Sequence, residues 1–246
     1  MSAGVVVRRG ASGGGTSVAR IFVPEPAQLR SRVGSRVVSD SHDHYFTAQP
    51  ASAAERRTLG LRLAGRDVEV EVASGVFSPG RIDLGTQVLL RTVAPLRGIA
   101  AGAHVLDLGC GWGPVALTMA LDAPDATVWA VDVNERALDL VRRNAERLGL
   151  PGVRAVTPDD VPADLAFAAL WSNPPIRVGK DALHAMLLRW LPRLAPGADA
   201  HLVVQRNLGA DSLTSWLAAN LPPLAPGASV EKVASAKGFR VLRVSV

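Results

Sequence analysis

Two short motifs in this chain carry residue types that can do chemistry. The first is the glycine-rich run Asp-Leu-Gly-Cys-Gly-Trp-Gly at residues 107–113, and the second is Ser-Asn-Pro-Pro-Ile at residues 172–176. Glycines after an apolar strand let the backbone turn sharply and approach a ligand without an intervening Cβ. Two consecutive prolines remove backbone donors and leave carbonyl oxygens to accept hydrogen bonds. Together the motifs predict a nucleotide-like ligand held opposite an amine.

The glycine-rich run narrows the class of nucleotide. The dinucleotide-binding fingerprint would place a third glycine where this chain has Pro114, so a nicotinamide dinucleotide is disfavoured. A phosphate-free ligand such as S-adenosylmethionine does not need the helix N-terminus as an anion site and tolerates the proline. A tight turn can also use glycines for geometry alone. The cofactor contacts predicted from this run are Asp107, Gly109, Cys110 and Gly111.

Acidic residues after the next two strand candidates extend this site. Asp132 lies about 20 positions beyond the glycine run, where a carboxylate accepts hydrogen bonds from both ribose hydroxyls, and Val133 is expected beside it on the cofactor. Asn134 either joins them or, as we favour, caps the next helix. Asp159 or Asp160 is placed to accept from the adenine amino group, and the alternative is a local Pro-Asp turn.

The Asn-Pro-Pro motif has the right groups to activate an amine. An exocyclic amine conjugated to a ring is a poor nucleophile, because its lone pair is delocalised. Hydrogen bonds from the amine to the Asn173 side-chain oxygen and the Pro174 carbonyl would localise that lone pair and orient it toward a methyl donor. A separate general base is not required, since the proton can leave after transfer. The predicted catalytic set is Asn173, Pro174, Pro175 and Ile176, and the alternative is a strand-ending turn.

Composition excludes several classes of protein. The chain has 246 residues, enough for one sizeable core, and no apolar run approaches the ~18 residues of a membrane span. No secretory signal is apparent, and Cys110 is the single cysteine, which excludes an internal disulfide and fits a reducing cytoplasm. The net charge of +5, carried mostly by arginine, permits a nucleic acid as partner without requiring one. We expect no metal and no membrane association.

Two regions precede the glycine-rich run. Residues 1–40 are rich in glycine, serine and arginine and keep no helical or strand period, so we expect a basic, flexible extension that is either an RNA-binding arm or a solvated tail. Residues 41–98 are predicted to form a small subdomain, with a hairpin at 59–72 and a helix at 84–97 that ends before Pro95. The hairpin residues expected to point outward are Arg62, Glu69 and Glu71.

Residues 99–246 alternate strand and helix patterns, which predicts a mostly parallel sheet covered on both faces. The strand candidates are 103–108, 127–132, 153–156, 166–171, 199–205, 228–234 and 239–245, and the helix candidates are 113–121, 134–148, 180–194 and 211–220. Only four residues, 235–238, separate the last two strands, too few for a parallel crossover. The predicted fold is therefore α/β and Rossmann-like, a seven-stranded mostly parallel sheet with an antiparallel last strand.

Further motifs occur at a spacing typical of one family. They are His44-Tyr45-Phe46, Gly75-Val76-Phe77-Ser78, Asp83-x-Gly85-Thr86 before Leu89-Leu90, the glycine-rich run, Asn173-Pro174-Pro175 with Gly179-Lys180, and Lys237-Gly238-Phe239-Arg240. In these motifs the chain, from about residue 41 onward, resembles the small-domain class I methyltransferases that act on N2 of guanine in ribosomal RNA. The resemblance implies S-adenosyl-L-methionine as cofactor, and Phe77, Asp83, Gly85 and Thr86 closing the cofactor and target pocket.

Two features depart from the family pattern. The family usually has an aromatic residue after Asn-Pro-Pro that stacks on the base, and here the residue is Ile176. Losing such a stack weakens binding by roughly 1 to 3 kcal/mol, unless Phe46, Phe77 or Trp171 supplies a ring instead. Better-known members also carry a second, methyltransferase-like domain at the N-terminus that helps RNA docking, whereas this chain has only the extension.

The expected activity is therefore methylation of the exocyclic N2 amine of a guanine in ribosomal RNA. Ribosomal RNA or a ribosomal subunit is the expected partner, and the cytoplasm the expected location. The alternatives are methylation of a protein glutamine or another amine, and a non-catalytic S-adenosylmethionine-binding module. A module of that kind would not need Asn173, which argues against it.

Overall fold

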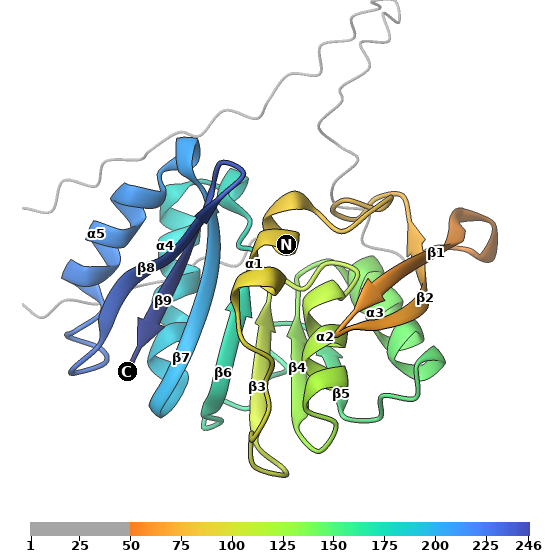
Figure 1. Ribbon diagram of the computed structural model, residues 1–246, viewed down its shortest axis with the longest axis horizontal. Coiled ribbons are helices and arrows are strands. Elements are labelled where there is room, and N and C mark those ends of the chain that lie inside the picture. Colours follow the sequence, from red (N-terminus) through yellow and green to blue (C-terminus); the bar gives the residue numbers. More distant parts are fainter. Residues whose placement is uncertain (1–49) are drawn as a thin grey trace, which may run out of the picture. The chain divides into compact units, whose positions relative to one another are not determined.

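The computed structural model of the protein describes residues 50–246 (Figure 1). The described helices and strands run from η2, which begins at Ala53, to β9, which ends at Ser245. The predicted basic extension at 1–40 and the motif at residues 44–46 lie outside the described residues.

The described elements alternate largely as predicted. The strands are β1 (Arg56–Leu63), β2 (Arg66–Ala73), β3 (His104–Leu108), β4 (Thr127–Val131), β5 (Val153–Val156), β6 (Phe167–Ser172), β7 (Leu194–Gln205), β8 (Ser229–Ala236) and β9 (Phe239–Ser245). The α-helices are α1 (Leu84–Thr92), α2 (Pro114–Asp122), α3 (Glu135–Arg147), α4 (Lys180–Trp190) and α5 (Ala210–Asn220). Short 3-10 turns are η2 (Ala53–Glu55), η3 (Ile176–Val178), η4 (Leu191–Arg193) and η5 (Arg206–Leu208).

Several boundaries differ from the prediction. Helix α1 ends at Thr92, two residues short of the predicted end before Pro95, because Val93 takes an extended backbone and its N–H caps the Leu89 carbonyl. Helix α4 ends at Trp190 rather than at residue 194, and the 3-10 turn η4 follows it. Strand β7 begins at Leu194, five positions before the predicted start at 199, because Leu194 pairs with Phe167 of β6. These differences concern the ends of helices and strands. There the local sequence preference is weakest, and contacts with neighbouring elements set the boundary.

The main sheet has the strand order β5-β4-β3-β6-β7-β9-β8. Strands β3 to β7 are parallel to one another, and β9 is antiparallel to both β7 and β8. The prediction of a seven-stranded, mostly parallel sheet with an antiparallel last strand is confirmed. The order reverses between β3 and β6, and ligands bind at such a switch point, beyond the carboxyl ends of the strands. We call this side of the sheet the carboxyl edge.

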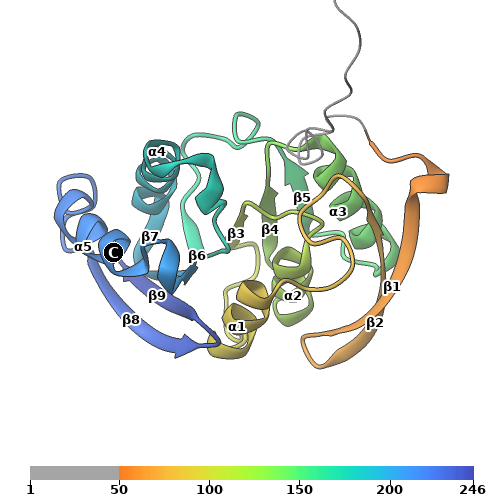
Figure 2. The same cartoon turned by 90° about the horizontal axis from the view of Figure 1, so that it is seen from above.

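Helices cover both faces of the sheet (Figure 2). Alternate residues of a strand point to opposite faces, so Val105 of β3 packs among apolar residues of α1, α2 and α3, whereas Leu106 packs among those of α4 and α5. Each face buries its own hydrophobic cluster, and β3 is covered on both sides. This packing fixes the position of the chain where it leaves β3 at the carboxyl edge.

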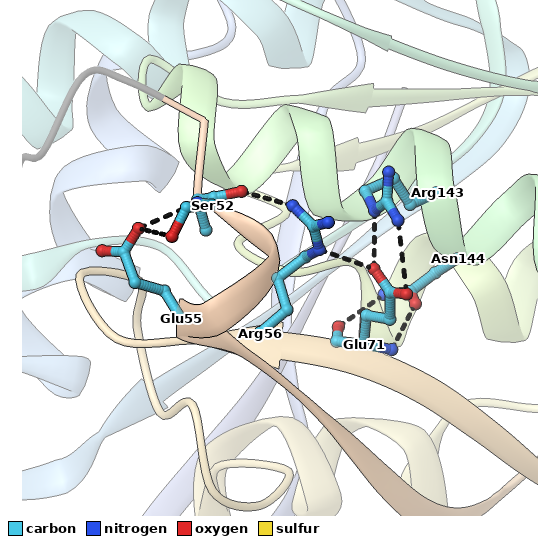
Figure 3. Close-up of polar contacts among 7 residues, drawn as sticks. Ser52, Glu55, Arg56, Glu71, Arg143 and Asn144 are labelled. Atoms are coloured by element: carbon cyan, nitrogen blue, oxygen red, sulfur yellow. Dashed lines mark hydrogen bonds and ion pairs between the residues drawn. The ribbon is translucent and has the colours of Figure 1, made fainter.

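The hairpin of β1 and β2 packs against α2 and α3 rather than joining the main sheet. The Asn144 side chain of α3 accepts a hydrogen bond from the backbone N–H of Glu71 at 2.6 Å and donates to its carbonyl at 3.0 Å. The Glu71 carboxylate pairs with Arg143 at 2.6 Å and Arg56 at 3.3 Å (Figure 3). The prediction that Glu71 points outward is therefore wrong, because α3 packs over it, whereas Arg62 and Glu69 are exposed as expected.

Candidate active site

The glycine turn connects β3 to α2 at the carboxyl edge. The backbone N–H groups of Gly109 and Cys110 both donate to the Val131 carbonyl, at 2.8 and 3.0 Å, which holds the turn against the end of β4. Gly109 and Gly111 have φ values of 77° and 53°, a region in which other residues are strained. The turn therefore presents bare backbone toward the space above the sheet.

Asp107 lies beneath this turn and is buried, with 1% of its surface exposed. Its carboxylate accepts one hydrogen bond, from the backbone N–H of Ala116 in α2 at 2.8 Å. Burial raises the pKa of Asp107 to about 8; the Ala116 N–H opposes this rise, and the nearby Asp132 carboxylate adds to it. A buried carboxyl of this kind is suited to bind a cationic ligand. The positive charge of the ligand would stabilise the ionised carboxylate, which burial alone destabilises.

Asp132 follows β4 and is bonded on both carboxylate oxygens. One oxygen accepts from the Gly111 N–H and the other from the Asn134 N–H, each at 2.9 Å. Burial raises the pKa of Asp132, against the effect of these N–H groups. A carboxylate has about four acceptor positions, so capacity for ribose hydroxyls remains, and the ribose role stays a prediction. Asn134 caps α3 through a bond from the Arg136 N–H, which confirms the predicted cap.

Asn173 is held by the first turn of α1, a contact that the sequence did not predict. Asp83 caps α1, and its Oδ2 accepts from the N–H groups of Gly85 and Thr86 at 2.8 and 3.4 Å. The Asn173 amide nitrogen donates to the same Asp83 oxygen and to Thr86 Oγ1, at 3.0 Å each. A carboxylate can only accept, so the amide nitrogen must face α1. The Asn173 Oδ1 accepts no hydrogen bond from residues 50–246 and remains available to a donor.

The rest of the Asn-Pro-Pro turn is partly engaged. The Pro174 carbonyl already accepts from the Ile176 N–H at 2.9 Å, and the Pro175 carbonyl from the Val178 N–H at 3.2 Å. A carbonyl has two lone pairs, so Pro174 can accept one further bond. The side chain of Ile176 is half-buried and packs against the core on the α4 side.

A cavity at the carboxyl edge joins these parts. The lining residues come from the loop before α1, from α1, from the glycine turn and α2, and from the end of β6: Phe77, Ser78, Asp83, Thr86, Asp107, Gly109, Cys110, Gly111, Trp112, Pro114, Val115 and Asn173. Most residues that the two motifs and the family resemblance singled out are therefore brought together. Some residues that the sequence predicted to bind the cofactor or the amine are not in its lining. They include Gly85, Asp132, Val133, Pro174, Pro175 and Ile176.

Two aromatic residues line this cavity, Phe77, which is exposed, and Trp112, which is buried. Half of the surface of Phe77 is exposed, whereas Trp171 is 2% exposed within the core, so the suggestion that Trp171 could face a base is wrong. Phe46 lies outside the described residues. Ser78, next to Phe77, has a φ of 49°, and its carbonyl accepts from the buried indole N–H of Trp112 at 3.2 Å. This bond holds the Phe77 loop against the glycine turn.

The two carboxylates predicted for adenine lie at a different cavity. Asp159 pairs with Arg189 of α4 at 2.9 Å, and Asp160 accepts from the Thr157 hydroxyl at 2.6 Å. Both residues line an open cavity beside Arg189 and Arg193 rather than the one at the glycine turn. Their role toward adenine stays a prediction, since the ion pair and the local turn account for both side chains.

The fold and the cavity define a class of protein. A parallel sheet with an antiparallel strand near its end, a bare glycine turn over a buried acid, and an acid ending the next strand form the cofactor half of a class I methyltransferase. Residues 67–243 match the family model "Methyltransferase small domain". The chain belongs to this family and is an S-adenosyl-L-methionine-dependent methyltransferase.

Two curated relatives extend this result. The uncharacterized protein YbxB of Bacillus subtilis (strain 168) is 34% identical over 170 residues, covering 68% of this chain and 83% of that protein. Ribosomal RNA small subunit methyltransferase C of Pseudomonas aeruginosa (strain LESB58) is 33% identical over 162 residues, covering 63% of this chain and 47% of that protein. The chain thus spans about half the length of this ribosomal RNA relative.

The fold is also similar to a solved structure, the T. thermophilus 16S rRNA N2 G1207 methyltransferase (RsmC) in complex with AdoMet and guanosine. The TM-score is 0.65 at 22% identity, and the match covers 80% of this chain and 52% of that one. At this identity the likeness establishes the fold. Within residues 50–246, no helix is long and apolar enough to cross a membrane.

Proposed function

We propose that this protein transfers a methyl group from S-adenosyl-L-methionine to the exocyclic N2 amine of a guanine in ribosomal RNA. The observation that carries the proposal is the orientation of Asn173. Its amide nitrogen is bound by Asp83 and Thr86, which leaves Oδ1 as an acceptor beside the cavity. An acceptor oxygen held in this way binds an N–H donor, and a target amine has one to offer.

Different residues at the cavity would bind the cofactor and act on the amine. S-adenosyl-L-methionine, when bound, supplies the activated methyl group. Asp107, Gly109 and Gly111 would hold it, because the glycines offer backbone without a Cβ and the buried acid suits a cationic ligand. The fit rests on this bare turn and on the raised pKa of Asp107. Asp132 would hold the ribose.

Asn173 acts on the amine. Its Oδ1 accepts a hydrogen bond from the amine, and the Pro174 carbonyl accepts the other N–H through its second lone pair. These bonds draw the nitrogen lone pair out of conjugation and stabilise the positive charge that develops on nitrogen. Asp83 and Thr86 are positioning residues, since they act through Asn173. The Asp83 carboxylate also polarises the amide and makes its oxygen a stronger acceptor.

The choice of guanine in RNA has separate support. Phe77 presents a half-exposed ring to the same cavity, and flat rings of this kind stack on nucleobases. Relatives that are 33% identical over 162 residues and 31% identical over 228 residues are named as ribosomal RNA small subunit methyltransferases. RNA and protein substrates share the Asn-Pro-Pro chemistry, so the substrate class is the part to be tested. The cytoplasm, where ribosomal RNA occurs, is the proposed location.

The test is methyl transfer from methyl-labelled S-adenosyl-L-methionine to three substrates. These are protein-free small-subunit ribosomal RNA, the assembled small subunit, and total cell protein, each with the parent and with Asn173→Ala. We expect label in one of the ribosomal substrates and, after digestion, as N2-methylguanosine by mass spectrometry. Label confined to protein would replace the RNA proposal with glutamine or other amine methylation. Cofactor binding with no transfer to any of the three would identify a non-catalytic binding module.

A further inference from the structure

The carboxyl edge of the sheet carries different charged groups on its two halves. The half that follows β4 presents the Asp132 carboxylate, whereas Asp159 and Asp160, in the loop after β5, lie beside Arg189 and Arg193 of the α4 end. The half that follows β6 and β7 and includes the turn between β8 and β9 presents three cations instead, Lys180, Arg206 and Lys237. Figure 1 shows that turn on the same side of the sheet as the carboxyl ends of the parallel strands. Asn173 lies where the two halves meet.

The three cations have no acidic partner within residues 50–246, whereas nine arginines of that range form ion pairs. Arg143, Arg147 and Arg189 are paired with carboxylates at 2.6 to 2.9 Å. Lys180, Arg206 and Lys237 are exposed, and none forms an ion pair or a side-chain hydrogen bond with residues 50–246. Three acids lie near them: Asp211 is paired with Arg240, Asp83 is bonded to Asn173 and to the Gly85 N–H, and Asp181 lies in the first turn of α4. The excess positive charge is therefore available to a partner.

A continuous set of contacts links these cations to Asn173. The Arg206 N–H donates to the Gly238 carbonyl at 2.8 Å, which joins η5 to the Lys237 turn. The next residue, Phe239, packs its ring so closely on Gly85 that a Cβ there would lie 2.9 Å from Cε1. Gly85 belongs to the same turn of α1 that holds Asn173. On the other side, only η3 and Gly179 separate the Asn-Pro-Pro turn from Lys180.

Lys237 lies at the tip of a two-residue hairpin turn. Its φ is 50°, and Gly238 follows with 81°, the same left-handed geometry as at Ala64 and Gly65 in the other hairpin. Asn, Asp and Gly are the residues that such a turn prefers. The chain has lysine at only three positions, and two of them, Lys180 and Lys237, are on this half of the edge.

We propose that Lys180, Arg206 and Lys237 form a docking surface for the phosphates of the RNA strand that flank the target nucleotide. The inference rests on the proposed function and names how its substrate is held. A single-stranded segment fits best, because a base can reach Asn173 only when it is splayed out of its stack. The phosphates on either side of that base then meet the basic half of the edge, away from the carboxylates that serve the cofactor.

The experiment compares two triple variants of the full chain. The first is Lys180→Gln, Arg206→Gln and Lys237→Asn; asparagine is chosen because it tolerates the left-handed backbone. The matched control is Arg66→Gln, Arg91→Gln and Arg97→Gln, three exposed cations without ion pairs in the described chain. Arg66 and Arg97 act electrostatically on Asp122 at the end of α2, which places them at the opposite edge of the sheet. Both variants lose three positive charges.

Fluorescence anisotropy with a labelled single-stranded RNA of about 20 nucleotides measures affinity between roughly 50 and 250 mM KCl. Each phosphate contact contributes about 0.7 to the slope of log K against log salt. We therefore expect the first variant to lose about 2 units of slope and to bind at least tenfold more weakly at low salt. The control should stay near the parent, and calorimetry should give all three proteins the same affinity for S-adenosyl-L-methionine.

Equal slopes for the two variants would overturn the docking surface. If the parent nevertheless transfers methyl to ribosomal RNA, the proposed function stands and only the docking surface fails. Conversely, a selective loss of RNA binding in the first variant, with transfer only to protein, would keep the surface as a nucleic-acid contact and remove the proposed substrate. Absence of RNA binding by the parent would overturn the docking surface as well.

Discussion

The cofactor half and the amine half of the carboxyl edge are held in place by different kinds of contact. On the cofactor half, carboxylates bind backbone N–H groups that are near in sequence, 9 positions away for Asp107 and 21 for Asp132. On the amine half, Asn173 is held by side chains 90 and 87 positions away, Asp83 and Thr86. The first half is thus built within consecutive βα units, whereas the second depends on a helix from a different part of the chain.

This difference has a consequence for mutation. Every residue except proline has a backbone N–H, so on the cofactor half a substitution removes the bond mainly when it replaces the acid. On the amine half both partners are side chains. The orientation of Asn173 can therefore be lost by substituting Asn173 itself or by substituting Asp83 or Thr86. The following variants separate binding by the first half from chemistry by the second.

Asn173→Ala should have the largest effect. The variant removes the acceptor that acts on the amine in the transition state, and we expect transfer at least ~100-fold slower with nearly normal cofactor affinity. Single-turnover rates on the substrate identified above, with calorimetry of the cofactor, measure both. Asn173→Asp is the control that keeps an acceptor oxygen and should retain partial activity. If Asn173→Ala transferred methyl as fast as the parent, Asn173 would have no catalytic role and the motif would be only a strand-ending turn.

Asp132→Ala should instead affect binding. Two ribose hydroxyls would lose their acceptor, and the Gly111 N–H would lose its partner, so we expect cofactor binding weaker by roughly 1 to 3 kcal/mol. Titration calorimetry measures the change, and Asp132→Asn, which keeps one acceptor oxygen, should lose less. Unchanged affinity in the alanine variant would show that the carboxylate only supports the glycine turn.

Protonation of Asp107 should make the stability of the folded protein depend on pH. Its pKa is about 8 in the folded protein against 3.8 ordinarily, so the folded chain keeps a proton that the unfolded chain releases. Stability from this group is therefore greatest below about pH 4 and is lost as pH rises toward 8. Asp107→Asn cannot ionise, so its melting temperature should exceed that of the parent by several degrees at pH 8 and about match it at pH 4.

The same variant tests the cofactor role of Asp107. A cationic ligand favours the ionised carboxylate, so binding to the parent at pH 7 should release protons and give a buffer-dependent enthalpy. Asp107→Asn should bind more weakly and show no such dependence. Equal affinity and equal buffer dependence in both proteins would remove Asp107 from the cofactor site.

Phe77→Ala should have the smallest effect, confined to the target. If the ring stacks on a base, the KM for RNA should rise about tenfold, in line with 1 to 3 kcal/mol per stacked base, while cofactor affinity stays unchanged. Phe77→Tyr keeps the ring and should act like the parent. A loss of cofactor affinity without a change in the KM for RNA would assign Phe77 to the cofactor half instead.

Sequence reasoning predicted the sheet well, because its evidence is local. Apolar strands alternate with helices, and the short link before Phe239 permits only an antiparallel pair, so the antiparallel pairing of the last two strands was predicted correctly. It failed at Glu71, where alternation placed the side chain outward and α3 packs over it. It also failed at Trp171, since an apolar run does not reveal whether a ring ends in the core or at a cavity.

The sequence by itself determined the chemical parts: glycines for a bare turn, acids after two strands, and an amide before two prolines. Their residue types and spacing are enough, because each part is built within one strand and the turn that follows it. Only the tertiary structure decided which way the Asn173 amide faces, that Phe77 lies at the cavity, and that Arg206 bonds to the turn at Gly238. These depend on contacts between segments far apart in the chain: Asn173 with the first turn of α1, Trp112 with the Phe77 loop, and β7 with β9.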